Sequence, residues 1–184
     1  MIRQQREKLK VYEFLYNRLP FSDIEKKELE QLRKEEELER QFEQQLAQIS
    51  LDNIEVLWHC EFRDHHCSDI VNVLLATDYC YYLFILKDLE GTFRVNAFNI
   101  LCNEDNAPIL NLNDAEQIYT HFRNILIDEG KYQRPIILKY IVMNPKFHIQ
   151  GARSEMLLKQ GDLPYYLKAI ESAAKVRKKY QRPL

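Results

Sequence analysis

The chain changes its hydrophobic period near Asp52, and this change limits the folds that it can adopt. Residues 1–50 contain few β-branched side chains and many Glu, Gln, Lys, Arg and Leu residues, all of which favour helices. Beyond residue 52, runs of β-branched and aromatic residues alternate with short turn segments, as expected for strands. The sequence therefore predicts an N-terminal helical arm followed by a sheet-containing domain.

Two helices are predicted in this N-terminal region. The first covers about residues 3–17 and ends before Pro20, which cannot continue a helix. The second begins at Ser22, because Glu25 three residues later completes the spacing of a capping box, and it extends to about residue 48. Its apolar stripe consists of Ile24, Leu32, Leu38, Phe42, Leu46 and Ile49.

Four strands are predicted at residues 53–62, 68–76, 79–87 and 92–101. The second and third are apolar on both faces, which is typical of central strands that helices cover on both sides. Asn113, with Glu116 as its reciprocal cap, opens a helix that ends at Gly130. A buried strand at residues 135–143 and a helix after Asp162 complete the order, which predicts an α/β fold with a mixed sheet flanked by helices.

Charge and hydropathy exclude several functional classes. The formal net charge is −2, so no overall basic field favours strong non-specific binding to nucleic acid. The longest apolar run, residues 79–86, is too short to span a bilayer, and we expect no membrane partner. The N-terminus lacks an apolar signal segment, and the four cysteines show no paired spacing. We therefore expect a cytoplasmic protein with reduced thiols.

Two charged residues fall at positions where burial is expected. Glu39 lies seven residues from both Leu32 and Leu46, so it shares their helical stripe and points toward the sheet. Lys87 ends a very apolar strand and shares a face with Ile85, where it can stabilise negative charge or orient a water molecule. For each residue the alternative is an ordinary side chain that reaches solvent.

Two further groups of residues have weaker chemical implications. Metal-ligand side chains occur close together at His59, Cys60, His65, His66 and Cys67. Their spacing is not that of a zinc knuckle, so a hairpin with two histidines at its turn is the preferred interpretation. The basic residues between Lys175 and Arg182 fit either an acidic or phosphate-bearing partner or a solvated chain end.

Four short segments together carry a resemblance to a known family: Leu38-Glu39, Lys87-Asp88-Leu89-Glu90-Gly91, Asn113-Asp114-Ala115-Glu116-Gln117 and Asn144-Pro145. With the order of elements, they make residues 38–144 resemble the nuclease-related domain (NERD) family of the restriction-endonuclease-like PD-(D/E)xK superfamily. That family has Gly-Glu, Lys-Asn-x-x-Gly and Asn-Pro-x-x-Gln at the first three places. The resemblance implies a restriction-endonuclease-like mixed sheet, with residues 1–50 as a helical arm running into the first core helix and residues 38–184 as the α/β domain.

The resemblance also implies a site and its loss. Such nucleases bind a divalent cation, usually Mg²⁺, through a helix Glu and two strand carboxylates, and a Lys stabilises charge. Here Glu39 and Lys87 match, whereas Asn72 and Ile85 stand at the positions of the two strand carboxylates. The implied protein is a pseudo-enzyme with a relic site and no cofactor.

Two alternatives remain open. A degenerate domain of this kind implies DNA or protein binding instead of DNA cleavage. The apolar stripe along residues 24–49 favours packing either on the domain itself or on a second copy, as a homodimer through the N-terminal helices. In the first alternative, the chain is an active Mg²⁺-dependent deoxyribonuclease that uses Glu39 and a migrated ligand, Asp69. In the second, it is an unrelated helical-arm interaction module, and Glu39 and Lys87 lie far apart in space.

Overall fold

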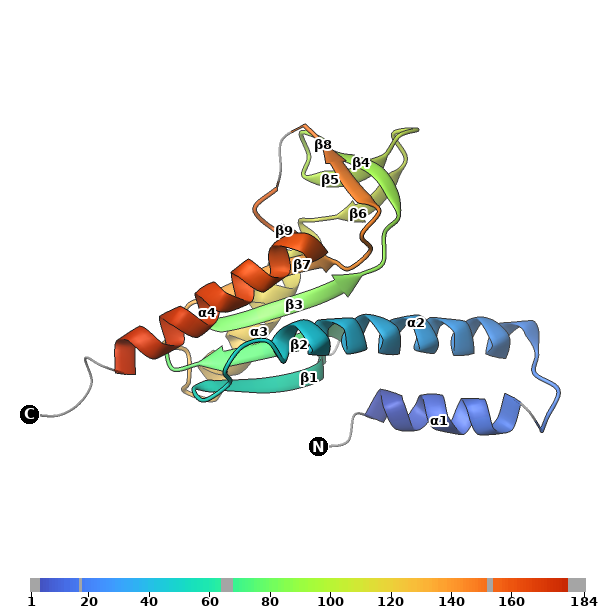
Figure 1. The fold of residues 1–184 in the computed structure, drawn as a ribbon, viewed down its shortest axis with the longest axis horizontal. Coiled ribbons are helices and arrows are strands. Elements are labelled where there is room, and N and C mark those ends of the chain that lie inside the picture. Colours follow the sequence, from blue (N-terminus) through green and yellow to red (C-terminus); the bar gives the residue numbers. More distant parts are fainter. Residues whose placement is uncertain (1–3, 17, 64–67, 152–153, 179–184) are drawn as a thin grey trace, which may run out of the picture.

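Two antiparallel helices at the N-terminus lead into a sheet with helices on both faces (Figure 1). They are α1 (Gln4–Tyr16) and α2 (Asp23–Leu46). The computed structural model describes residues 4–16, 18–63, 68–151 and 154–178. Helix α1 and the first half of α2 form an arm that stands away from the rest, and the second half of α2 packs on the sheet (Figure 1).

The start of α2 confirms the predicted capping box. The Ser22 amide donates to the Glu25 carboxylate at 2.8 Å, and the Glu25 amide donates to the Ser22 hydroxyl at 3.3 Å. The predicted apolar stripe is wrong at its first position, because Ile24 is 79% exposed and burial begins at Leu29. A stripe is buried only where a neighbouring element covers it, and Ile24 lies in the first turn, at the tip of the arm (Figure 1).

The main sheet has five strands in the order β1-β2-β3-β7-β9. The first three are antiparallel neighbours, and β3, β7 and β9 are parallel. Their bounds are β1 (Ile54–Arg63), β2 (Ser68–Thr77), β3 (Tyr81–Lys87), β7 (Ile136–Val142) and β9 (Leu157–Lys159). The prediction that the second and third strands are central and buried is confirmed.

Helices cover both faces of this sheet, which confirms the α/β class. On one face, α2 and α4 (Leu163–Lys178) pack with Phe42, Phe84 and Leu167 in one core cluster. On the other face, α3 (Asp114–Asp128) contributes Ile118 and Phe122 to a second cluster. A short 3₁₀ turn, η1 (Gln160–Asp162), leads into α4. No helix in the described part of the chain is both long and apolar enough to cross a bilayer.

A second, four-stranded sheet replaces the single strand predicted at residues 92–101, and that prediction is wrong. The order is β6-β5-β4-β8, with bounds β4 (Gly91–Val95), β5 (Ile100–Asn103), β6 (Pro108–Asn111) and β8 (Phe147–Gln150). The chain reverses between β4 and β5 because the Asn96 side chain accepts the amides of Phe98 and Ile100, and Asn99 adopts a left-handed φ of 58°. Asparagine suits such turns through its side-chain hydrogen bonds and its tolerance of positive φ.

The same turn explains why the predicted cap of α3 is also wrong. Asn113 already has a helical conformation, with φ −72° and ψ −17°, and makes no side-chain cap. The side-chain NH₂ group of Asn113 donates to the Phe98 carbonyl at 2.9 Å, so the residue connects the small sheet to α3. The position marks the start of the helix as predicted, but its side chain serves a tertiary contact.

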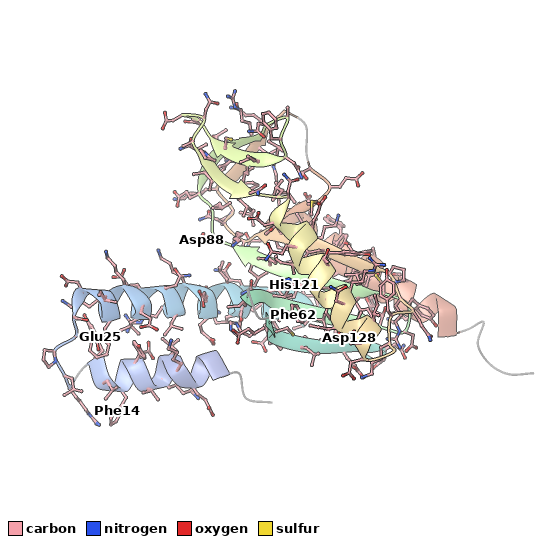
Figure 2. The ribbon with its side chains drawn as sticks, turned by 180° about the vertical axis from the view of Figure 1, so that it is seen from behind. Phe14, Glu25, Phe62, Asp88, His121 and Asp128 are labelled. Carbon is pink, nitrogen blue, oxygen red and sulfur yellow. The ribbon has the colours of Figure 1, made fainter. Side chains whose placement is uncertain are left out.

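The two sheets share a junction at the carboxyl ends of β3 and β7. Strand β3 leads into β4, and β7 leads into β8. Strands β3 and β7 are parallel neighbours in the main sheet, and β4 and β8 are parallel neighbours in the small sheet. Across the junction, the Asn144 amide donates to Asp88 at 2.9 Å, and Lys146 pairs with Glu90 at 2.7 Å. Figure 2 shows Asp88 at this junction.

Candidate functional site

The main sheet forks near this junction, where β2 and β3 stop pairing. Their ladder ends at Val73 opposite Phe84, although both strands continue. The Leu86 amide donates instead to the side-chain oxygen of Asn72, at 2.8 Å. A side-chain amide thus replaces a backbone partner, and the strands separate at this point.

The β1–β2 hairpin changes faces at the same level. Trp58 and Val73 pack in the cluster under α2 and α4, whereas Cys60 and Val71 pack in the cluster under α3. Residues two apart on a regular strand share a face. His59 lies between Trp58 and Cys60 and has a left-handed φ of 51°. This backbone conformation interrupts the regular alternation of side chains in β1. By the register of the ladder, His59 lies opposite Asn72.

A hollow of about 380 Å³ occupies the fork between the strands and α2. Its lining includes Asn72, Ile85 and Lys87, the three strand positions that the family resemblance assigned to the relic site. The other lining residues are Gln31, Lys34, Glu35, Leu38, His59, Ile70, Leu86 and Asp88. The fold therefore brings these strand positions to one place, between a helix and the ends of two strands.

Glu39 lies behind this hollow and is buried, with 1% of its surface exposed. This confirms its predicted orientation toward the sheet, and the alternative of a solvent-reaching side chain is wrong. Its Oε1 atom lies 3.9 Å from Nδ1 of His59, which lines the hollow. His59 therefore links the buried helix residue to the lining of the hollow, although Glu39 itself does not line it.

Lys87 is half-buried at the end of β3. Loss of hydration lowers the pKa of its ammonium group, and the carboxylates of Glu35 and Asp114 only partly oppose that effect. Among the described residues Lys87 forms no ion pair. The hollow thus contains an ammonium group that no carboxylate of the described residues contacts directly, although Glu35 and Asp88 share its lining.

His59 is the second titratable group at the fork. Burial lowers the pKa of its imidazole, with Glu35 and Glu61 opposing. Its buried Nδ1 has no hydrogen-bond partner in the part of the chain that the structure describes. This nitrogen faces the buried Glu39 carboxylate at 3.9 Å and has no access to solvent, so it is not a donor or acceptor for a ligand in the hollow.

The lining side chains offer few oxygen ligands at the places where the resemblance requires them. Ile85 is 5% exposed and apolar, and the Asn72 oxygen is already bonded to Leu86. Within the described residues, no three His, Cys, Asp or Glu side chains lie close enough together to hold a metal ion. Asp69 pairs with Phe62 in the β1–β2 ladder, but its side chain lies outside the described part, so its role as a migrated ligand is untested.

The cluster of metal-ligand residues is only partly described. His65, His66 and Cys67 lie outside the described residues. Cys60 packs under α3, and burial raises the pKa of its thiol to about 11. Burial therefore favours the neutral thiol of Cys60 at neutral pH.

Sequence reasoning missed the helix and rim residues of the hollow. Lys34 and Glu35 stand in a run of charged residues that gives no sign of which side chains face the fork. Asp88 was matched to the family pattern without a role in the site, and it lines the hollow. A second hollow of about 370 Å³, on the other side of Leu38 and Asp88, extends the concave surface toward Asn144.

The basic end of α4 lies away from this site. The helix begins near β9 and runs to the opposite end of the sheet (Figure 1). There Lys175 pairs with Glu171, which also accepts the Ser50 amide at 3.0 Å. The basic side chains beyond Lys175 lie outside the described part.

The arm carries a separate group of exposed apolar side chains. Val11, Phe14, Leu19 and Ile24 are each more than half exposed. Figure 2 shows Phe14 and Glu25 on the arm, far from α3 and its neighbour Phe62. The homodimer expected through the N-terminal helices stays a prediction.

Comparisons with known proteins add no relative from which a function can be transferred. No protein-family model matches the chain, and searches of curated proteins and of solved structures found no match.

Proposed function

We propose that this chain is a nuclease-like domain that binds a partner and has lost metal-dependent DNA cleavage. The observation that carries the proposal is the fork: Asn72, Ile85 and Lys87 line one hollow, with Glu39 buried behind it. These are the positions at which the restriction-endonuclease-like pattern places two carboxylates, a lysine and a helix glutamate. This placement supports the proposal that the chain derives from a catalytic scaffold in which two acids were replaced.

The order of elements supports the same scaffold. Helix α2 is followed by three antiparallel strands, β1 to β3, then by α3 and by β7, which is parallel to β3. Helices α2 and α3 lie on opposite faces of this sheet. This arrangement is the one expected from the resemblance to the NERD and PD-(D/E)xK proteins, and the small second sheet is inserted between β3 and α3 and completed by β8.

The donor chemistry of the fork does not fit Mg²⁺. That ion requires oxygen ligands in near-octahedral geometry and usually takes one or two carboxylates. Ile85 supplies no ligand atom, and the Asn72 oxygen is used by the Leu86 amide. We therefore propose that the domain works without a metal cofactor, with DNA or a protein as the predicted partner.

Restoring the two acids tests the proposal directly. We expect the Asn72→Asp, Ile85→Glu double variant to gain a Mn²⁺-dependent rise in melting temperature, because ligand binding to the folded state stabilises it. The matched control, Asn72→Asp with Ile85→Gln, has the same bulk and lacks one carboxylate, so its rise should be smaller. The unmodified chain should show neither the rise nor cleavage of plasmid DNA.

The opposite result has a definite form. Mg²⁺-dependent cleavage by the unmodified chain, abolished by both Glu39→Ala and Lys87→Ala, would overturn the proposal and establish the active nuclease. In that case Asp69→Asn would also abolish cleavage if Asp69 is the migrated ligand. A lack of metal-dependent stabilisation in the restored variant would show that the fork is not the remnant of a metal site.

A further inference from the structure

Lys87 and Asn72, which we call the floor of the hollow, present hydrogen-bond donors, and the same lining also contains the carboxylates of Glu35 and Asp88. Lys87 supplies an ammonium group that forms no ion pair with the described residues. Taking a charge out of water without a partner is unfavourable, and buried charges are normally paired. The chain thus keeps a cation where an apolar residue would be more stable, which favours a role for Lys87 in binding over a role in stability.

Asn72 supplies a second donor, and its orientation is fixed. The Leu86 backbone N–H is a donor, so the Asn72 atom that it contacts at 2.8 Å must be the carbonyl oxygen. The NH₂ group of the same side chain therefore remains as a donor, and Asn72 lines the hollow. One ammonium at the end of β3 and one side-chain amide within β2 form a site for oxygen atoms that carry negative charge.

The rim of the hollow carries mixed charge. Lys34 adds a second ammonium group, while Glu35 and Asp88 are carboxylates. Each carboxylate is hydrogen-bonded by an amide, Glu35 by Gln31 at 2.7 Å and Asp88 by Asn144 at 2.9 Å. The acids lower the positive potential of the whole hollow, and Glu35 acts on Lys87 itself, so an anion is favoured only in direct contact with the ammonium and amide donors.

Size and wall chemistry suit a small organic ligand. The hollow measures about 380 Å³, and ligand pockets commonly span roughly 300–1,000 Å³. Leu38, Ile85 and Leu86 provide apolar walls beside the polar floor. A molecule with one anionic end and a flat or apolar body has matching chemistry.

We propose that this hollow is a metal-independent binding site for a phosphate monoester, with Lys87 and the Asn72 amide as its oxyanion donors. The inference deepens the proposed function and rests on it, because it assigns anion binding to the hollow in which related nucleases would bind a metal ion and cleave DNA. A free mononucleotide and the phosphorylated end of a nucleic acid carry the same group, so both are sources of the ligand.

Calorimetric titration at constant ionic strength tests the site with defined probes. These are inorganic phosphate, deoxyadenosine monophosphate against deoxyadenosine, and a 5′-phosphorylated oligothymidylate against its unphosphorylated form. We expect each phosphate-bearing organic probe to bind more tightly than its partner without phosphate. Equal affinity for the two phosphorylated probes would indicate a small-molecule ligand, and tighter binding of the oligonucleotide would indicate a nucleic-acid end.

Variants assign the binding to the floor of the hollow. Lys87→Met keeps the length of the side chain and should weaken phosphate binding by about tenfold or more, the usual effect of losing a charged hydrogen bond. Asn72→Ala should weaken it by a smaller factor. Lys168→Met, on the exposed surface of α4, is the matched control and should bind as the unmodified chain does. Binding that is insensitive to Lys87→Met, or no binding of any phosphorylated probe, would overturn the inference without affecting the metal-restoration result.

Stability gives a second readout that a merely structural lysine would not share. Burial lowers the pKa of Lys87, so the folded chain carries a penalty for the charged form. The penalty is complete below the folded-state pKa and disappears as the pH rises toward the unfolded value near 10.5. Lys87→Met should therefore melt at a higher temperature than the unmodified chain at neutral pH, with a difference that shrinks in alkali. A lower melting temperature at neutral pH would mean that Lys87 is there for stability.

Discussion

The two halves of helix α2 are stabilised by different means. The first half lies beside α1, where Leu29 and Leu32 are buried and exposed ion pairs join the two helices, Lys8 to Glu28 at 2.5 Å and Arg33 to Glu13 at 3.1 Å. The second half buries Glu39 near His59 of β1, and its Phe42 packs with residues of the sheet and of α4 in one core cluster. One continuous helix therefore belongs to a thin, largely polar arm at one end and to the core at the other. Only the core end reaches the forked strands, so we expect the arm to open without disturbing the candidate site.

Truncation of a core aromatic should have the largest effect. Phe42 is fully buried, and its ring lies against those of Trp58 and Phe84, with centroids 6.0 and 5.5 Å away. Phe42→Ala should lower the free energy of unfolding by about 3–5 kcal/mol, measured by chemical denaturation. Leu29→Ala in the arm is the comparison: it should increase hydrogen exchange in α1 and change global unfolding much less. Equal losses from the two variants would show that arm and core unfold as one unit.

The left-handed residue in β1 provides the next effect. His59 has φ 51°, a conformation that β-branched residues adopt only with strain. His59→Val should reduce stability by about 1–3 kcal/mol and alter the hollow. His59→Asn should be close to the unmodified chain, because asparagine tolerates this region. A well-tolerated valine would mean that β1 can pair regularly through this point, and the change of faces would then have another cause.

Loss of the α2 cap should affect only the arm. Ser22→Ala removes the hydroxyl that accepts the Glu25 amide and should destabilise this end of the helix by about 1 kcal/mol. Faster amide exchange is expected in the first turns of α2, with no change near Phe42. Altered exchange at β3 would contradict the independence of the arm.

The smallest effect is expected from an exposed ion pair. Arg33→Ala removes the partner of Glu13, and surface pairs of this kind contribute about 0–1 kcal/mol. The difference should decrease further in high salt, which screens exposed charges. Arg33 also lines the second hollow, so unchanged phosphate binding by this variant would confine the oxyanion site to the floor near Lys87.

The sequence predictions were correct where a local pattern of residues indicates burial or capping. Seven-residue spacing placed Glu39 on the inner face of α2, and its burial followed because a long helix keeps its phase. Apolar runs identified β2 and β3 as central strands because only a strand covered on both faces is apolar on both. The capping box at Ser22 is a short-range interaction, and neighbouring residues suffice to form it.

The small sheet was missed for the converse reason. Its strands are short, and its pairings join β4 to β8, more than fifty residues later in the sequence. Asn96 and Asn99 did mark the turn that ends β4, since asparagine commonly occupies such positions. The strand prediction ran through that turn because it followed the apolar residues on both sides of it.

The sequence by itself determined the arm, the covered sheet and the identities of the residues at the candidate site, since helical phase and strand hydropathy are local properties. Only the tertiary structure decided that β2 and β3 stop pairing beyond the Val73–Phe84 pair, that His59 turns the hairpin to the other face, and that Lys34, Glu35 and Asp88 join the site. Where two strands stop pairing depends on competition between distant segments for the same backbone groups, and here a single asparagine side chain takes the place of a strand.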